Sequence, residues 1–213
     1  MENYEIYSHV DHTLLSPTAT YEQIRKVAIE AIEHKCACLC IPASYVSRVH
    51  KEFPELNISG TVAFPLGYNT LDTKIAETKN ALKDGANEID FVINLGYVKD
   101  NRFDLVEEEI KALKEVCGNK VLKVIIETCY LTDDEKIELC KCVTNAKADY
   151  IKTSTGFGPK GATIDDIKLF KKYIGPNVKM KAAGGIRTRE DMENYLKEGC
   201  DRIGCSAAVK VLD

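Results

Sequence analysis

The chain has no excess of positive charge, no long apolar run and no leader-like start. Its 29 lysines and arginines are outnumbered by 33 aspartates and glutamates, which gives a net charge of −4. That balance argues against nucleic acid or an anionic membrane as a partner, because both attract a positive surface. No apolar stretch approaches the roughly 18 residues of a spanning helix, and the N-terminus lacks the segments of a signal peptide. We therefore expect a cytoplasmic protein.

The nine cysteines lack the spacings of metal or redox sites. There is no CxxC pair and no Cys/His pairing at zinc spacing, and the count is odd. Cys36, Cys38 and Cys40 alternate, so on a strand they would share one face. We expect free, reduced and mostly buried thiols, with a structural zinc site as the weaker alternative.

Short β-rich runs alternate with longer amphipathic runs along the whole chain. Eight runs have strand character: His9–Asp11, Cys38–Ile41, Ser59–Ala63, Glu88–Asn94, Val121–Glu127, Asp149–Thr153, Lys179–Ala183 and Arg202–Cys205. Seven segments have helix character: Tyr21–His34, Ala43–Glu52, Leu71–Asp84, Phe103–Val116, Asp133–Ala146, Thr163–Tyr173 and Arg189–Lys197. No linker or low-complexity segment interrupts this order.

This alternation predicts an α/β fold, a (β/α)₈ TIM barrel built as a single domain over residues 1–213. A doubly wound open sheet is the alternative, but such a sheet usually has fewer units. No GxGxxG motif follows the first strand, so the dinucleotide-binding version loses its main support. In a barrel the functional residues lie at the carboxyl ends of the strands.

Local signals mark several helix ends. Thr132 and Thr188 each stand three residues before an acidic side chain, which is the spacing of a capping box. The glycines that fall at expected helix ends suit left-handed caps; they are Gly85, Gly118, Gly175 and Gly199.

Three of the expected strands carry a charge where burial is costly. Asp90 lies inside EIDFVIN, Lys152 ends the apolar run of YIKTST, and Lys181 precedes the double glycine of KMKAAGG. These are strands four, six and seven, so the three side chains could meet in one pocket. A purely structural ion pair is the alternative, but buried pairs stabilise weakly because desolvation offsets the attraction.

The trio suits amine chemistry. A neutral lysine attacks carbonyls and forms a Schiff base, but its pKa of about 10.4 must fall to about 7, which requires roughly 4.6 kcal/mol. A second ammonium about 5 Å away supplies roughly 3.3 kcal/mol at an effective dielectric of about 20. Lys152, which precedes a polar loop, is the better nucleophile, although a swap with Lys181 stays open. Asp90 would then transfer protons. Lys179 shares the parity of Lys181 and should also point inward, either in a buried pair or on an irregular strand.

Two stretches near the C-terminus suit a phosphate. Gly184 and Gly185 follow strand seven with Arg187 before the next helix, and Gly204 and Ser206 follow strand eight. Glycines let backbone N–H groups approach an anion, and helix N-termini favour negative charge. The loops after strands seven and eight are a frequent phosphate site in barrels.

Together these motifs resemble one family. VDHTLL, EIDFVIN, KVIIET, KTSTGF and KAAGGIRT occur in order between about Val10 and Ser206 and are similar to deoxyribose-phosphate aldolases, which are class I aldolases. The resemblance implies reversible cleavage of 2-deoxy-D-ribose 5-phosphate into acetaldehyde and D-glyceraldehyde 3-phosphate. It implies Lys152 as the Schiff-base lysine, Lys181 as its partner and Asp90 as the proton relay. No metal or organic cofactor is expected, because the iminium formed on the lysine accepts the electrons of the broken carbon–carbon bond.

The resemblance also implies a binding set. The phosphate region maps to Gly156, Gly184, Gly185, Arg187, Gly204 and Ser206. Further positions that would line the cavity are Asp11, Thr13, Cys40 and Lys123. Cys40, if exposed there, would be open to modification by an aldehyde.

Two departures from the family pattern concern the phosphate and the C-terminus. Some members have a lysine where this chain has Phe157, so that phosphate contact is either absent here or supplied by Lys160. Longer members carry a C-terminal tail that reaches the site, and here the chain ends at Asp213.

Three questions stay open from the sequence. A homodimer or homotetramer is possible. Another Schiff-base aldolase of the same barrel, acting on keto acids or dihydroxyacetone units, is the nearest alternative function. A non-catalytic sugar-phosphate sensor is the remote one, since it would not need the reactive amine.

Overall fold

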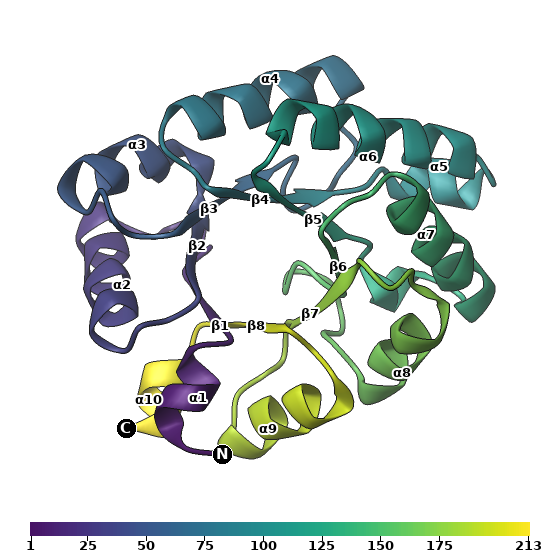
Figure 1. The fold of residues 1–213 in the computed structure, drawn as a ribbon. Helices are drawn as coiled ribbons and strands as arrows, with labels where there is room; N and C mark the ends of the chain where they lie inside the picture. Colours follow the sequence, from purple (N-terminus) through teal and green to yellow (C-terminus); the bar gives the residue numbers. More distant parts are fainter.

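Eight parallel strands close into a barrel in the computed structural model, which describes all of residues 1–213, and helices surround them (Figure 1). The strands pair in chain order, and β1 pairs with β8 to close the ring. They are β1 (Val10–Thr13), β2 (Cys38–Pro42), β3 (Ile58–Val62), β4 (Glu88–Val92), β5 (Val121–Ile125), β6 (Tyr150–Lys152), β7 (Lys179–Ala183) and β8 (Arg202–Cys205). The predicted TIM barrel and all eight of its strands are confirmed.

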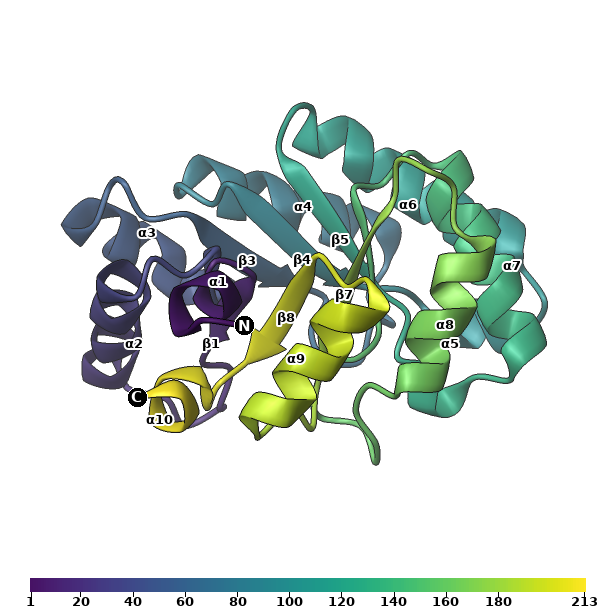
Figure 2. The same cartoon turned by 60° about the horizontal axis from the view of Figure 1, so that its bottom comes forward.

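The helices form the outer layer. The seven long ones are α2 (Tyr21–Glu33), α3 (Ala43–Glu52), α4 (Leu71–Lys83), α6 (Phe103–Cys117), α7 (Asp133–Asn145), α8 (Ile164–Tyr173) and α9 (Arg189–Glu198), each within two residues of its prediction. The turned view in Figure 2 shows α8 and α9 side by side outside β7 and β8. Three short helices were not predicted, namely α1 (Asn3–Tyr7), α5 (Leu95–Lys99) and α10 (Ala208–Leu212), because five residues are too few to show a helical period. None of the helices combines the length and the apolarity that crossing a membrane requires.

The predicted caps are mostly confirmed. The side chains of Thr132 and Thr188 each accept a hydrogen bond from the backbone N–H three residues on. In each case the acidic side chain at that position accepts in turn from the backbone N–H of the threonine. The glycines that follow α4, α6 and α9 have positive φ, as expected for Gly85, Gly118 and Gly199. Gly175 is the exception, because α8 ends in an extended residue. A side chain at Gly175 would lie 2.4 Å from Thr144, so close packing is the reason for that glycine.

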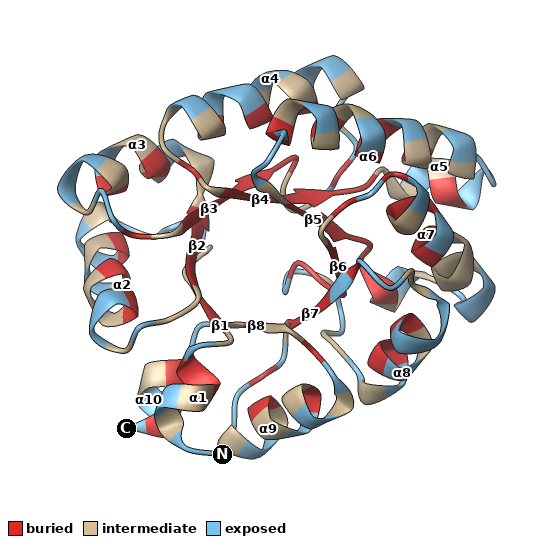
Figure 3. Ribbon diagram, viewed as in Figure 1, coloured by how far each residue is buried: buried red, intermediate tan, exposed pale blue.

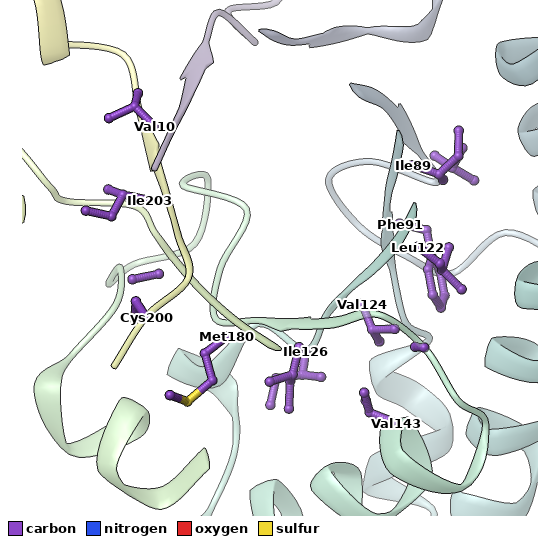
Figure 4. Packing of buried hydrophobic residues seen from close by; sticks show 14 of the residues in the cluster. Val10, Ile89, Phe91, Leu122, Val124, Ile126, Val143, Met180, Cys200 and Ile203 are labelled. Carbon is purple, nitrogen blue, oxygen red and sulfur yellow. The ribbon is translucent and has the colours of Figure 1, made fainter. Parts of the chain in front are cut away.

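The apolar core lies between the barrel and its helices. Figure 3 shows the barrel strands mostly in the colour of buried residues. The strand residues that alternate outward, such as Ile89 and Phe91, are fully buried. Figure 4 shows Phe91, Leu122 and Val124 directed from β4 and β5 toward the surrounding helices. This layer supplies most of the buried apolar area and so most of the stabilisation of the fold.

The inside of the barrel, in contrast, is filled with charges. On β4, Ile89 and Phe91 face the helices, whereas Glu88 and Asp90 face inward and are almost fully buried. Barrel interiors are ordinarily filled by layers of branched apolar side chains. A polar interior of this kind indicates a site rather than a packing core.

The cysteines are all free thiols, as predicted. Cys38 and Cys40 are buried on β2, and the Cys40 sulfur lies 3.9 Å from an Asp90 oxygen inside the barrel. Cys36 precedes the strand, so the expected face of three cysteines is wrong in its first member.

Candidate active site

A cavity of about 310 Å³ opens at the carboxyl ends of the strands. Its walls come from the loops after β1, β6, β7 and β8. Among its lining residues are Thr13, Lys152, Gly156, Gly184, Gly185, Arg187, Gly204 and Ser206. Eight of the thirteen residues predicted for the site therefore meet at one opening, where the barrel geometry leads us to expect it.

Lys152 lies at the floor of this cavity, on the last residue of β6. Its side chain is only 3% exposed, and its Nζ donates to Asp90 Oδ2 at 2.7 Å. The strand pairing places Lys152 directly beside Lys181 on β7. The trio predicted from three separate strands is thus brought together.

Asp90 is the centre of the group. Its Oδ2 accepts from Lys181 at 2.7 Å as well as from Lys152, and its Oδ1 accepts from Lys123 at 2.8 Å and from the Ser59 hydroxyl at 2.7 Å. Burial alone would raise the pKa of this carboxyl, but the three ammonium groups hold it well below its usual range. Asp90 is therefore a carboxylate at neutral pH.

The two lysines beside Asp90 differ in their remaining contacts. Lys181 also pairs with Asp11, whereas Lys152 contacts no second carboxylate. Burial lowers the pKa of Lys152 and Lys181 lowers it further, and Asp90 offsets only part of this. Burial acts on Lys181 in the same direction, but Asp11 and Asp90 outweigh it and raise the pKa of Lys181 above its ordinary value. Lys152 is thus the amine more easily deprotonated.

A second tier of charges lies beneath the trio. Lys123 Nζ lies 2.5 Å from Glu88 Oε2 and 3.3 Å from Asp11 Oδ2, and Arg202 Nη1 lies 2.6 Å from Asp11 Oδ1. Glu88 and Arg202 were not predicted. The parity of Glu88 with Asp90 on β4 could have revealed the first, whereas nothing in the sequence pairs Arg202 with a carboxylate 191 residues away.

This tier includes the side-chain types of a metal site. Oxygen and sulfur atoms of Asp11, Cys38 and Glu88 lie within 4.8 Å of one another. Both carboxylates are already paired with Lys123 and Arg202, and a cation would have to displace these side chains. The absence of a metal or other cofactor from the reaction stays a prediction.

The loops after β7 and β8 form the outer part of the cavity. Gly184 and Gly185 have φ of 81° and 77°, in the region where a side chain would be strained. A Cβ at Gly161 would lie 2.1 Å from the Gly184 carbonyl oxygen. Gly204 serves a different purpose, since a Cβ there would lie 3.0 Å from Ala183 and 3.3 Å from the Lys181 chain. It leaves room for that lysine to reach the interior.

Glu127 was also missed by the sequence reasoning. It follows β5 with a left-handed backbone and is 2% exposed. Its carboxylate accepts the backbone N–H of Thr155 at 3.1 Å and the hydroxyl of the same residue. Burial raises the pKa of Glu127, and the bonds from Thr155 offset part of that rise. Glu127 fixes the loop that follows Lys152.

Several expectations are corrected by the structure. Cys40 is completely buried rather than exposed to the cavity, and burial raises the pKa of its thiol, so the predicted aldehyde modification has no accessible thiolate. Asp11 and Lys123 likewise lie beneath the cavity rather than along it, because they are in the second tier. Only Thr13 of that group lines the cavity.

The structure also shows where the residues discussed for the phosphate contact lie, together with Lys179. Phe157 lines the cavity and packs its ring edge-on against Phe64, with the centroids 5.5 Å apart. Lys160 is exposed and does not line the cavity. Lys179 is exposed at the amino end of β7, where its Nζ lies 5.8 Å from the centroid of the Tyr150 ring. It is on a regular strand, so neither a buried pair nor an irregular strand explains it.

A lysine amine beside a second, fixed ammonium, on the floor of an open barrel mouth, is the arrangement of an aldolase that works through an imine. Residues 6–207 match the model of a family described as DeoC/LacD family aldolase. The chain belongs to this family. The predicted resemblance to deoxyribose-phosphate aldolases is confirmed, and with it the enzyme class, a carbon–carbon lyase.

Relatives cover the chain from end to end. A deoxyribose-phosphate aldolase of Clostridium botulinum (strain Alaska E43 / Type E3) is 62% identical over 213 residues, which are 100% of this chain and 96% of that protein. The deoxyribose-phosphate aldolase of Clostridioides difficile (strain 630) is 47% identical over 208 residues, covering 97% of this chain and 95% of its own.

Solved structures agree with the fold. A deoxyribose phosphate aldolase from Aeropyrum pernix, described as a unique tetramer, superimposes with a TM-score of 0.88 at 32% identity, over 99% of this chain and 91% of its own. A structure described as QR15, an aldolase, has a TM-score of 0.94 at 32% identity and covers 98% of this chain and 94% of its own.

Proposed function

We propose that this aldolase reversibly cleaves 2-deoxy-D-ribose 5-phosphate into acetaldehyde and D-glyceraldehyde 3-phosphate through a Schiff base on Lys152. The observation that carries the proposal is the contact set of Lys152. It is the one amine of the trio that reaches the cavity and touches a single carboxylate, Asp90, at 2.7 Å. The relatives that match this chain over its whole length include proteins named deoxyribose-phosphate aldolase.

The chemistry follows from the positions of the groups. The Lys152 amine attacks the aldehyde carbon C1, water is lost, and an iminium forms. Removal of the proton from the hydroxyl on C3 turns C3 into the aldehyde carbon of the departing D-glyceraldehyde 3-phosphate. The electron pair of the broken C2–C3 bond moves into the iminium to give an enamine. Protonation at C2 and hydrolysis release acetaldehyde. Asp90, acting through water, takes and returns the proton, and Lys181 stays charged to keep its neighbour reactive.

The substrate phosphate would lie at the outer loops. At Gly184 and Gly185 no side chain covers the backbone, so the backbone itself lines the cavity. Arg187 and Ser206 line the same cavity. Backbone N–H groups and an exposed guanidinium suit a dianion. Thr13, on β1 beside β8, also lines the cavity and is available to the sugar hydroxyls.

Borohydride trapping tests the proposal. Reduction in the presence of 2-deoxyribose 5-phosphate should attach a two- or five-carbon unit, and peptide mapping should place it on Lys152. The Lys152→Met variant should lose about 10⁴-fold or more of the cleavage rate, as other enzymes do when their covalent nucleophile is removed. A label on Lys181 would reverse the assignment of the two lysines, and no label would remove the imine mechanism. Activity on a keto acid without acetaldehyde release would identify a different aldolase.

We further propose a cytoplasmic homo-oligomer, either a dimer or a tetramer. A tetrameric relative supports the second of these, and the nine free cysteines suit a reducing compartment.

A further inference from the structure

Seven charged side chains inside the barrel form one continuous network. Four are cations and three are carboxylates: Lys123, Lys152, Lys181 and Arg202 face Asp11, Glu88 and Asp90. If all were ionised, the network would carry one uncompensated positive charge. An excess charge in a buried site is costly, because little water is present to solvate it.

The cations are not equally placed to lose a proton. Lys123 contacts all three carboxylates, and Arg202 contacts Asp11 and Glu88. Lys181 contacts two carboxylates, and Lys152 only one, which it shares. Loss of a proton from Lys152 therefore sacrifices the fewest contacts and balances the network at three against three.

We propose that Glu88 and Arg202 are positioning residues that set the proton state of Lys152 by fixing the charge balance of the network. Neither residue lines the cavity, so neither touches substrate there. Arg202 stands opposite Lys181 in the strand pairing and holds Asp11, which in turn holds Lys181 as an ammonium. Glu88 shares the compensation of Lys123 with Asp90 Oδ1, and Asp90 Oδ2 accepts from the two upper lysines. The inference rests on the proposed role of Lys152 as the reacting amine.

The groups that face Lys152 support this account. They are Asp90 from β4, Lys181 from β7, Cys40 from β2, and Lys123 and Glu127 from β5 and its end, with Asp11 from β1 behind Lys181. Burial raises the pKa of the Cys40 thiol and so keeps it neutral. Glu127 makes no ion pair with the seven and is bonded to Thr155. Burial, together with Lys181, lowers the pKa of Lys152, although Asp90 opposes them.

Opposite charge changes at the two positions give opposite predictions. Arg202→Met removes a cation, so the Lys152 ammonium becomes more stable and the amine forms only at higher pH. Glu88→Gln removes an anion and does the reverse. A unit charge about 10 Å away, at an effective dielectric of about 20, shifts a pKa by about one unit. The double variant restores the original excess of one cation and should behave like the wild type.

The measurement is the pH dependence of imine formation with acetaldehyde, trapped by cyanoborohydride and quantified by intact mass. Acetaldehyde carries no phosphate whose own titration would overlap the profile. On the acidic limb of this pH profile, imine formation falls as Lys152 becomes protonated. That limb should shift to higher pH by about one unit in Arg202→Met and to lower pH by about one unit in Glu88→Gln. Lys179→Met is the matched control, because its amine lies at the same 5.8 Å from the Tyr150 ring centroid as the Arg202 guanidinium, but is exposed to solvent. Its limb should stay at the wild-type pH.

The direction in which the acidic limbs shift decides whether Glu88 and Arg202 set the proton state of Lys152. Limbs that move in the same direction, or that stay in place while activity falls, would show that the two residues act only as structural support and would overturn the proposal. If Arg202→Met does not fold by circular dichroism, Glu88→Gln with its lower limb and Arg202→Lys with an unchanged limb carry the test. Absence of label on Lys152 in the wild type would instead reject the proposed function, so the two failures are distinguishable.

Discussion

At the scale of single residues, Asp90 performs two tasks. It keeps three ammonium groups together inside the barrel, at 2.7 to 2.8 Å from each, and it is the group placed to move protons during cleavage. The two tasks depend on different properties, since the first needs a negative charge and the second needs a base.

Asp90→Asn should therefore separate imine formation from cleavage. Loss of the negative charge lowers the pKa of Lys152, so trapping with acetaldehyde should persist, whereas loss of the base should lower the cleavage rate by about 10²- to 10⁴-fold. The ratio of the trapping rate to the turnover rate measures this directly. Ser59→Ala is the control, because it removes a hydroxyl bond to Asp90 at 2.7 Å without changing charge. Equal loss of trapping and turnover in Asp90→Asn would contradict the assignment.

At the scale of elements, the βα units deliver these residues with local signals that the sequence displays. The helix α7 begins at a capping box in which Thr132 Oγ1 accepts from Glu135 N at 3.3 Å and Thr132 N donates to Glu135 Oε2 at 2.7 Å. Glu135 also pairs with Lys99 of α5 at 2.8 Å. The start of α7 is therefore tied to the preceding unit of the barrel.

Thr132→Ala should cost about 1 kcal/mol of unfolding free energy, because one N-terminal amide of α7 loses its acceptor. For a chain of this length the melting temperature should fall by about 2–4 °C, which differential scanning calorimetry would resolve. Thr70→Ala provides the comparison, since Thr70 caps α4 without a side-chain bond to the helix backbone. Equal losses at the two positions would show that the bond contributes nothing.

At the scale of the whole molecule, the sequence was sufficient to predict the barrel and insufficient to predict its interior. Each strand was identified because outward apolar residues such as Ile89 and Phe91 repeat at the period of a strand. Asp90, Lys152 and Lys181 could be assigned to one pocket because they fall at equivalent places in the fourth, sixth and seventh strands. The partner of Arg202 could not be predicted, because ion pairs across a closed barrel join strands that are distant in the sequence.

Exposure was the other property that the sequence did not reveal. Lys179 and Lys181 have the same parity on β7, yet one is exposed and the other completely buried. Parity determines the side of a strand, whereas the depth along the barrel axis determines access to water. Cys40 was misjudged for the same reason, because it lies on the inner side of β2 but below the floor of the cavity.

The buried carboxylates should make the fold sensitive to acid. Asp11, Glu88 and Asp90 all have a pKa that neighbouring cations hold below its ordinary value, although burial acts in the opposite direction. A depressed pKa adds stability above the unfolded value of about 4, and that stability is lost as the pH falls. The melting temperature should thus decline below about pH 5, and less steeply in Glu88→Gln. A melting temperature that stays constant down to about pH 3 would contradict this.

The separation of the cavity wall from the charged tier beneath it has a consequence for how such an enzyme can change. Phe157 and Leu15 on the wall contact whatever enters, whereas the groups that tune the amine are walled off from the ligand. Substrate choice and nucleophile strength are therefore encoded by different sets of residues. A lineage or a laboratory selection can vary the first set and inherit the second intact, so that new aldehydes are accepted by an amine whose reactivity is already established.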